Sequence, residues 1–133
     1  MTLQLAQGRR FAGYAAIFDA PDSGGDVIRK GAFARAPKSG VPVLRQHDAR
    51  LRIGTVELLE EDARGLRIIA TVEAGEAVAP GAGLSFGYRV RGSINGTYRE
   101  LTDLDLVEVS LVNHPMQKLA RVLAVEEGDD DGL

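Results

Sequence analysis

The residues with the clearest capacity for chemistry are one serine and two histidines. Ser85 lies between two glycines in the pentapeptide GLSFG (residues 83–87), where a strand-like run begins, and the only two histidines are His47 and His114. A serine hydroxyl is a poor nucleophile at neutral pH, so an imidazole must take its proton. The glycines would let backbone approach a substrate and stabilise an oxyanion. Either Ser85 is a nucleophile served by His47 or His114, or the pentapeptide is an ordinary loop-to-strand junction.

A carboxylate interrupts the apolar run of residues 104–113. Period-two alternation places Glu108 and Ser110 on the same face as Leu104 and Leu106. A buried carboxylate is costly unless it is paired or hydrogen-bonded, so Glu108 must have a partner. That partner is either an arginine of a neighbouring strand or the imidazole that serves Ser85. The arginines in question are Arg89, Arg91 and Arg99.

Short strands rather than helices must position these residues. Residues 53–59 and 66–73 alternate on either side of an acidic turn, which predicts a hairpin with a loop of about six residues. Residues 85–92 and 94–101 flank an Asn-Gly dipeptide, which is typical of a two-residue type I′ hairpin turn. Further strands are expected at residues 10–18, 26–33, 42–46 and 104–113. The fold class predicted from these patterns is mainly β.

Length and composition restrict the class of protein. The chain has 133 residues, a net charge of -3 and no cysteine. We expect one domain over residues 1–125 and a solvated acidic tail over residues 126–133. The absence of cysteine excludes a disulfide framework and a thiol nucleophile. Scattered basic residues and the lack of a long apolar run predict a soluble protein that binds neither nucleic acid nor membrane and is not exported.

Three other kinds of site fit the sequence poorly. The pentapeptide also matches the nucleophile elbow of α/β-hydrolases, but that motif needs a helix after the serine, and a strand hairpin follows here. His47, Asp48 and His114 match no usual metal-ligand spacing, and the glycines of residues 81–87 lack the Lys-Ser/Thr of a phosphate loop. We therefore expect neither a metal nor a cofactor.

An ordered set of short matches covers residues 10 to 125. The matched segments are Gly31-Ala32-Phe33, His47, Ile53-Gly54-Thr55-Val56, Gly65-Leu66, residues 84–88, residues 106–112 and Pro115. In order and approximate spacing they resemble the prohead maturation proteases of tailed bacteriophages (Caudovirus). The resemblance implies a herpesvirus-assemblin-like fold, an antiparallel β-barrel with a few flanking helices. Family members usually carry a longer helical segment where residues 74–83 are short and rich in glycine.

The same resemblance implies a function and its residues. It implies a serine endopeptidase that acts inside the procapsid, in the cytoplasm of a bacterial host. The expected substrate and partner is the major capsid protein with its scaffolding segment, in a phage or a gene transfer agent-like particle. Self-cleavage and self-association are also implied.

By resemblance, His47 is the base, Ser85 the nucleophile and Glu108 the third member of the triad. Ser110 is a less favoured third member, and His114 is another, because herpesvirus enzymes use a second histidine. The alternative function is a catalytically inactive β-barrel module for capsid assembly.

Overall fold

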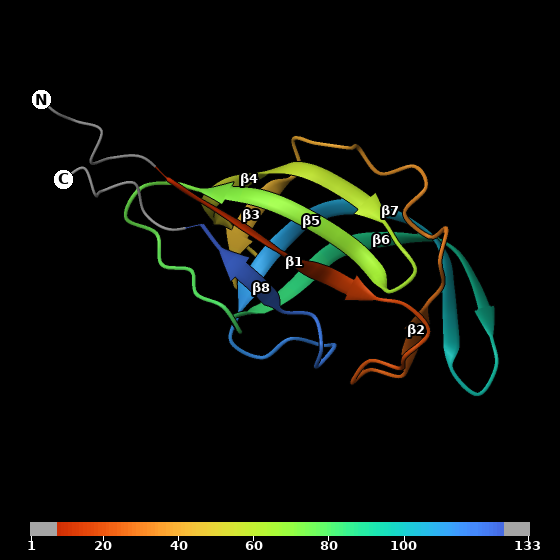
Figure 1. The fold of residues 1–133 in the computed structure, drawn as a ribbon. Helices are drawn as coiled ribbons and strands as arrows, with labels where there is room; N and C mark the ends of the chain where they lie inside the picture. Colours follow the sequence, from red (N-terminus) through yellow and green to blue (C-terminus); the bar gives the residue numbers. More distant parts are fainter. Residues whose placement is uncertain (1–7, 127–133) are drawn as a thin grey trace, which may run out of the picture.

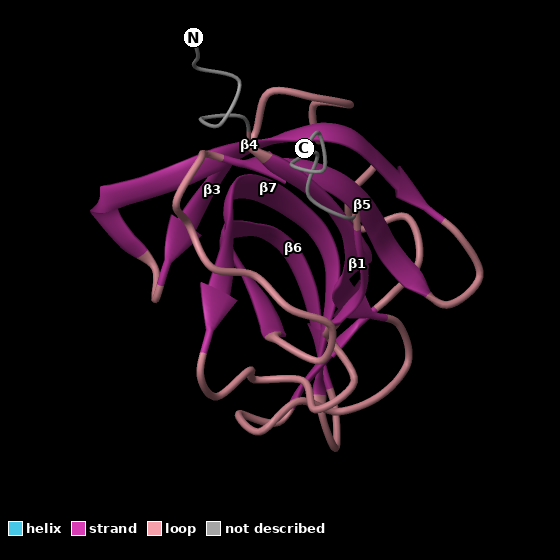
Figure 2. Cartoon of the chain, turned by 60° about the vertical axis from the view of Figure 1, so that its left-hand side comes forward, coloured by secondary structure: helices cyan, strands magenta, loops and turns pink. Residues whose placement is uncertain are grey.

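Eight strands and no helix make up the part of the chain that the computed structural model describes, residues 8–126 (Figures 1 and 2). The strands are β1 (Arg9–Ile17), β2 (Asp26–Ile28), β3 (Pro42–Arg45), β4 (Asp48–Glu61), β5 (Gly65–Val72), β6 (Gly83–Asn95), β7 (Arg99–Val112) and β8 (Val122–Val125). The predicted mainly-β fold class is confirmed. Of the predicted acidic tail, residues 127–133 lie outside the described residues.

The strands form one curved sheet in the order β2-β7-β3-β4-β5-β1-β8, and β6 pairs with β7. Most pairs are antiparallel, but β2 and β3 both pair with β7 in parallel. Between β6 and β8 there is only an isolated bridge, which joins Gly83 to Arg121. The sheet curls around the core without closing (Figure 2), so the predicted closed barrel is wrong. The reason is that β8 is short and β6 continues away from it, along β7.

The predicted flanking helices are also wrong for residues 8–126. Residues 29–36 form successive turns instead, in which Ala32 donates to the carbonyl of Arg29 (3.0 Å) and Ala36 to that of Phe33 (3.0 Å). Gly31 has a φ of 97°, in the left-handed region that a right-handed helix excludes. No helix within the described residues could span a membrane.

The β4–β5 hairpin is confirmed, with a shorter turn than predicted. Its turn comprises residues 62–64, and Oδ1 of Asp62 accepts hydrogen bonds from the N–H groups of Arg64 (2.8 Å) and Gly65 (3.1 Å). Asp62 also accepts from the Tyr14 hydroxyl, and this hydrogen bond raises the pKa of Tyr14. Because the Asp62 carboxylate accepts hydrogen bonds from the backbone N–H groups of the turn, the short turn is stable and a longer loop is not needed.

A second hairpin, β6–β7, is longer than predicted. The two strands remain paired until Asn95 opposite Arg99, so the loop is residues 96–98. The predicted two-residue Asn-Gly turn is wrong, because Asn95 is the last paired residue of β6. Strand β7 also joins the last residues of the predicted segment 94–101, from Arg99 on, to the predicted segment 104–113.

The apolar core lies inside the curve of the sheet, and its large, fully buried side chains come from most strands. They include Phe11, Ile28, Val43, Val56, Leu66, Ile68, Val72, Leu84, Leu104 and Val109. On β6, Leu84 and Phe86 belong to this core, and the Phe86 ring packs against Phe33 with centroids 5.3 Å apart. Since neighbouring side chains of a strand point to opposite faces, Ser85 faces away from the core.

Candidate active site

His47 lies in the tight turn that joins β3 to β4. Gln46 and His47 have φ values of 51° and 60°, and Arg45 pairs with Asp48 around them. Positive φ at both central residues is typical of a type I′ turn, which normally contains Asn or Gly. A left-handed conformation costs about 1–2 kcal/mol for other residues. The rest of the site must therefore hold this turn in place.

Strand β7 supplies that support. Because β3 runs parallel to β7, with Leu44 paired to Ser110, the turn lies directly over the end of β7. The N–H of Gln46 donates to the carbonyl of Leu111 (2.9 Å), and the N–H of His47 donates to Oγ of Ser110 (3.1 Å). Both strained residues are thus fixed by their own backbone groups.

Glu108 is the partner of the His47 ring. Its Oε2 lies 2.7 Å from Nδ1 of His47, and its Oε1 accepts a hydrogen bond from Oγ of Ser110 at 2.6 Å. An ionised carboxylate can only accept, so Nδ1 carries the ring proton and Nε2 is free to act as a base. The side chain of Glu108 is 9% exposed and that of His47 is 42% exposed. The pair therefore has a buried, fixed acceptor and an accessible imidazole.

Two of the three arginines considered as partners of Glu108 pair with aspartates instead. Arg91 pairs with Asp105 (2.6 Å) and Arg99 pairs with Asp26 (2.8 Å). Arg89 forms no ion pair within residues 8–126. The arginine pairing considered from the sequence is therefore wrong, because the partner of Glu108 is His47 and none of the three arginines pairs with it.

A β-bulge in β7 turns Glu108 away from the core. Leu106 pairs with Tyr88 and Glu108 with Gly87, which leaves Val107 as an extra residue that is 45% exposed. The predicted sharing of one face by Glu108 and the leucines at 104 and 106 is wrong, because the bulge shifts the alternation by one residue. A Cβ at position 87 would overlap the Glu108 carboxylate, so a larger residue in place of Gly87 would have to displace that carboxylate.

Ser85 lies on this same outer face. It is directly opposite Ser110 in the β6–β7 register and is 7% exposed. Directly opposite residues of antiparallel strands project to one side, with Cβ atoms about 4.5–5.5 Å apart. Within residues 8–126 the Ser85 hydroxyl makes no hydrogen bond to His47. A small cavity of about 30 Å³ adjoins Ser85 and is also lined by Tyr88, Met116 and Gln117.

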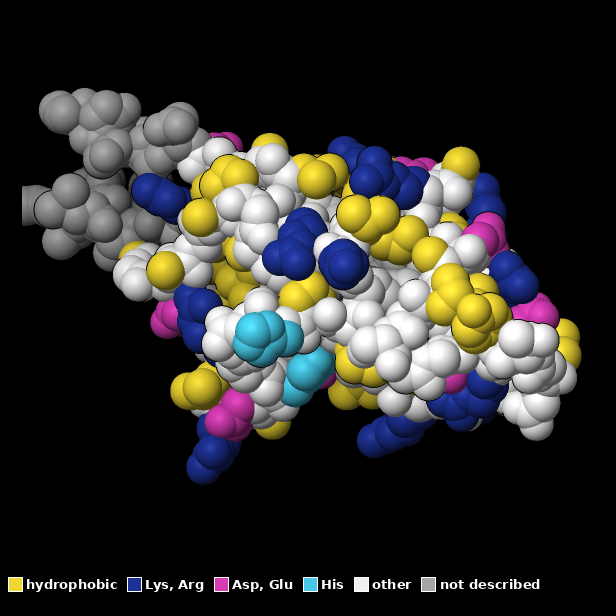
Figure 3. Space-filling view, turned by 90° about the horizontal axis from the view of Figure 1, so that it is seen from below, with side chains coloured by type: hydrophobic (Ala, Val, Ile, Leu, Met, Phe, Trp, Pro, Cys, Tyr) yellow, Lys and Arg dark blue, Asp and Glu magenta, His cyan; other side chains and the backbone are white. Residues whose placement is uncertain are grey.

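His114 lies beyond the end of β7 and is exposed. Both histidines are visible on one face of the molecule (Figure 3). A hydrogen bond from the N–H of Asn113 to Oε1 of Gln46 (3.2 Å) brings the two histidine-bearing segments together. In the described part of the chain, however, His114 makes neither a hydrogen bond nor an ion pair. No cluster of metal-binding side chains occurs there either.

The sequence matches one protein family over residues 2–131, the Caudovirus prohead serine proteases. The chain belongs to this family. A search of the curated proteins found no match. Among solved structures, the crystal structure of the KSHV protease in complex with a hexapeptide phosphonate inhibitor is similar, with a TM-score of 0.65 and 12% sequence identity. The match covers 92% of this chain and 66% of that chain.

The similarity to the KSHV protease confirms that this chain has a herpesvirus-protease-like fold. At such low identity it shows the fold alone. The family match extends over residues 2–131, so it includes the whole of the predicted resemblance, residues 10 to 125.

Sequence reasoning missed several residues of the site. Gln46 gave no signal beyond its place beside His47, because the positive φ of a non-glycine residue is not visible in the sequence. Gly87 was noted only as one of two glycines around Ser85, although its position opposite Glu108 gives it a separate role. Arg45, at the end of β3 beside the turn, was not singled out, and neither was Arg121.

Proposed function

We propose that this chain is a serine endopeptidase of capsid maturation, in which Ser85 is the nucleophile, His47 the base and Glu108 the residue that orients the base. The observation that carries the proposal is the 2.7 Å contact between Nδ1 of His47 and the buried Glu108 carboxylate, on the face of the sheet to which Ser85 projects. A carboxylate on Nδ1 holds Nε2 unprotonated and aimed outward, as a general base requires. Membership of the prohead serine protease family supports the same reaction class.

The proposed mechanism is acyl transfer. Nε2 of His47 takes the proton of the Ser85 hydroxyl while Oγ attacks the peptide carbonyl carbon. The imidazolium then gives this proton to the leaving amine as the peptide C–N bond breaks. Water, deprotonated by the same imidazole, releases the acyl group and restores Ser85. Catalytic hydrogen bonds are often long before substrate binds, so we expect the contact between Ser85 and His47 to form with the substrate in place.

The proposed substrate is the major capsid protein of the same particle, cleaved at its scaffolding segment within the assembling procapsid. The particle would be a phage or a gene transfer agent-like particle in a bacterial host. Self-cleavage and self-association belong to the same proposal. Co-expression with that capsid protein, followed by intact mass spectrometry, tests it: a truncated capsid product supports the protease.

An inactive assembly module is the second candidate. The observation that favours it is the absence of a hydrogen bond between Ser85 and His47 within the described residues. In the co-expression experiment this candidate predicts capsid protein of full mass, together with assembly that still requires the chain.

Ser110 offers a test of how the base is positioned. Its hydroxyl links the backbone of His47 to Glu108 and is fully buried. Each hydrogen bond contributes about 1 kcal/mol, so Ser110→Ala, which removes two, should lower kcat by about five- to thirtyfold with KM nearly unchanged. Ser110→Thr should restore much of the loss, because it keeps the hydroxyl. Steady-state cleavage of a peptide spanning the capsid cleavage site measures both constants, and a lower melting temperature without a change in kcat would contradict a positioning role.

A further inference from the structure

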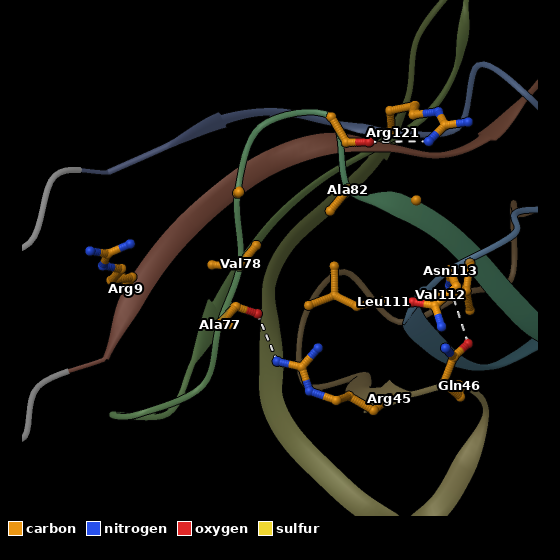
Figure 4. Close-up of a pocket in the computed structure, with 13 residues that line it drawn as sticks. Arg9, Arg45, Gln46, Ala77, Val78, Ala82, Leu111, Val112, Asn113 and Arg121 are labelled. Atoms are coloured by element: carbon orange, nitrogen blue, oxygen red, sulfur yellow. Dashed lines mark hydrogen bonds between the residues drawn. The ribbon is translucent and has the colours of Figure 1, made fainter.

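An arginine-lined pocket of about 550 Å³ lies beside the candidate active site (Figure 4). Each segment that carries a candidate catalytic residue contributes to its wall. Gln46 precedes His47, Gly83 precedes Ser85 by two residues, and Asn113 follows the end of β7. The pocket thus adjoins these chain segments, and none of the side chains of His47, Ser85 and Glu108 lines it.

Three arginines make the pocket positively charged. They are Arg9, Arg45 and Arg121. Arg45 is neutralised in part by Glu76 at 3.2 Å and donates to the carbonyl of Ala77 at 2.7 Å. Arg121 donates only to the carbonyls of Lys118 (2.9 Å) and Gly81 (3.1 Å), so its charge has no carboxylate partner within residues 8–126. The lining itself contains no Asp or Glu.

The short segment between β5 and β6 forms one side of this pocket. Within this segment the side chain of Val78 is buried, and the N–H of Gly81 donates a hydrogen bond to the carbonyl of Val122 at 2.8 Å. The hydrogen bond from Arg45 to Ala77 holds the same segment to β3 (Figure 4). The pocket thus combines an apolar floor, to which Val78 and Leu111 contribute, with cationic walls.

We propose that this pocket is a substrate subsite that binds an acidic side chain of the cleaved peptide. The proposal rests on the proposed function, and it names the substrate class: a peptide segment with Asp or Glu near the scissile bond. Because a strand rises about 3.3 Å per residue, the wall at Gly83 is about 7 Å from Ser85 along β6. The acidic residue should therefore lie about two or three residues from the cleaved bond. A guanidinium recognises a carboxylate through charge-assisted hydrogen bonds that an amide cannot match.

Paired peptides test this subsite. Each pair spans the capsid cleavage site and carries either Asp or Asn at one position near the scissile bond. We expect wild type to cleave the Asp peptide about tenfold faster in kcat/KM at one such position, and Arg121→Gln to reduce that ratio to near one. The matched control is Arg67→Gln, because Arg67 pairs with Glu60 at 3.0 Å and is not part of the pocket lining. Equal ratios in wild type and Arg121→Gln, or an equal loss in the control, would overturn the subsite.

Binding separates this proposal from the proposed function. With the Ser85→Ala chain, fluorescence anisotropy gives the Kd of each labelled peptide without cleavage. Tighter binding of the Asp peptide, lost in Arg121→Gln and weakened by salt, supports the subsite even if wild type cleaves nothing. Cleavage without any acidic preference rejects the subsite and leaves the protease.

The acidic segment of this chain is the competing occupant. In the full chain with Asp129, Asp130 and Asp131 changed to Asn, the Arg121→Gln effect on the peptides should persist. Its disappearance would show that the arginines act through the chain's own acidic segment and would overturn the substrate subsite.

Discussion

Changing Ser85 or His47 to Ala is expected to abolish truncation of the co-expressed capsid protein. Ser85→Ala removes the attacking oxygen, and His47→Ala removes the ring that is hydrogen-bonded to Glu108. Loss of a nucleophile or base in serine proteases lowers kcat by about 10⁴- to 10⁶-fold, so no truncated product should remain over a co-expression. Intact mass of the capsid protein, with the wild-type chain in parallel, measures this.

Ser93→Ala is the matched control for that experiment, because Ser93 is an exposed serine on the same strand, β6. It should leave the capsid product unchanged. Truncation that persists in Ser85→Ala would assign the nucleophile to another residue. A full-length capsid protein in every variant, wild type included, with assembly dependent on the chain, would favour the inactive assembly module.

Comparing the activities of Glu108→Gln and His114→Gln shows which of the two residues is the third member of the triad. The amide introduced by Glu108→Gln keeps the shape of the carboxylate but lacks the charge that stabilises an imidazolium. We expect Glu108→Gln to lower kcat/KM by about 10³- to 10⁴-fold. His114→Gln should change it by less than about threefold, because His114 makes no hydrogen bond within the described residues and so has no means of orienting the base.

Steady-state cleavage of the same peptide measures both variants. A melting temperature for each shows whether the fold is intact, and removing a buried charge by Glu108→Gln need not destabilise the fold. A large loss of kcat/KM in His114→Gln, with little change in Glu108→Gln, would mean that His114 is the third member of the triad.

The features that could be predicted from the sequence are those that depend on near neighbours. Alternation over residues 53–59 and 66–73 indicated the β4–β5 hairpin, because side chains alternate between faces whatever the rest of the fold does. Features that depend on distant backbone were missed. The bulge at Val107 and the end of the β6–β7 hairpin depend on how two strands pair over their whole length, so the predicted face of Glu108 and the Asn-Gly turn were both wrong.

Taken by itself, the sequence determined the mainly-β class, the family resemblance and the short list of His47, Ser85, Glu108, Ser110 and His114, because residue types and their order are local information. Only the tertiary structure decided which of these residues meet, namely His47, Glu108 and Ser110. Residues 47 and 108 are far apart in the chain, and the parallel pairing of β3 with β7 brings them within a hydrogen bond. That contact and the hydrogen bonds that hold the His47 turn on β7 come from long-range strand pairing, which no local pattern encodes.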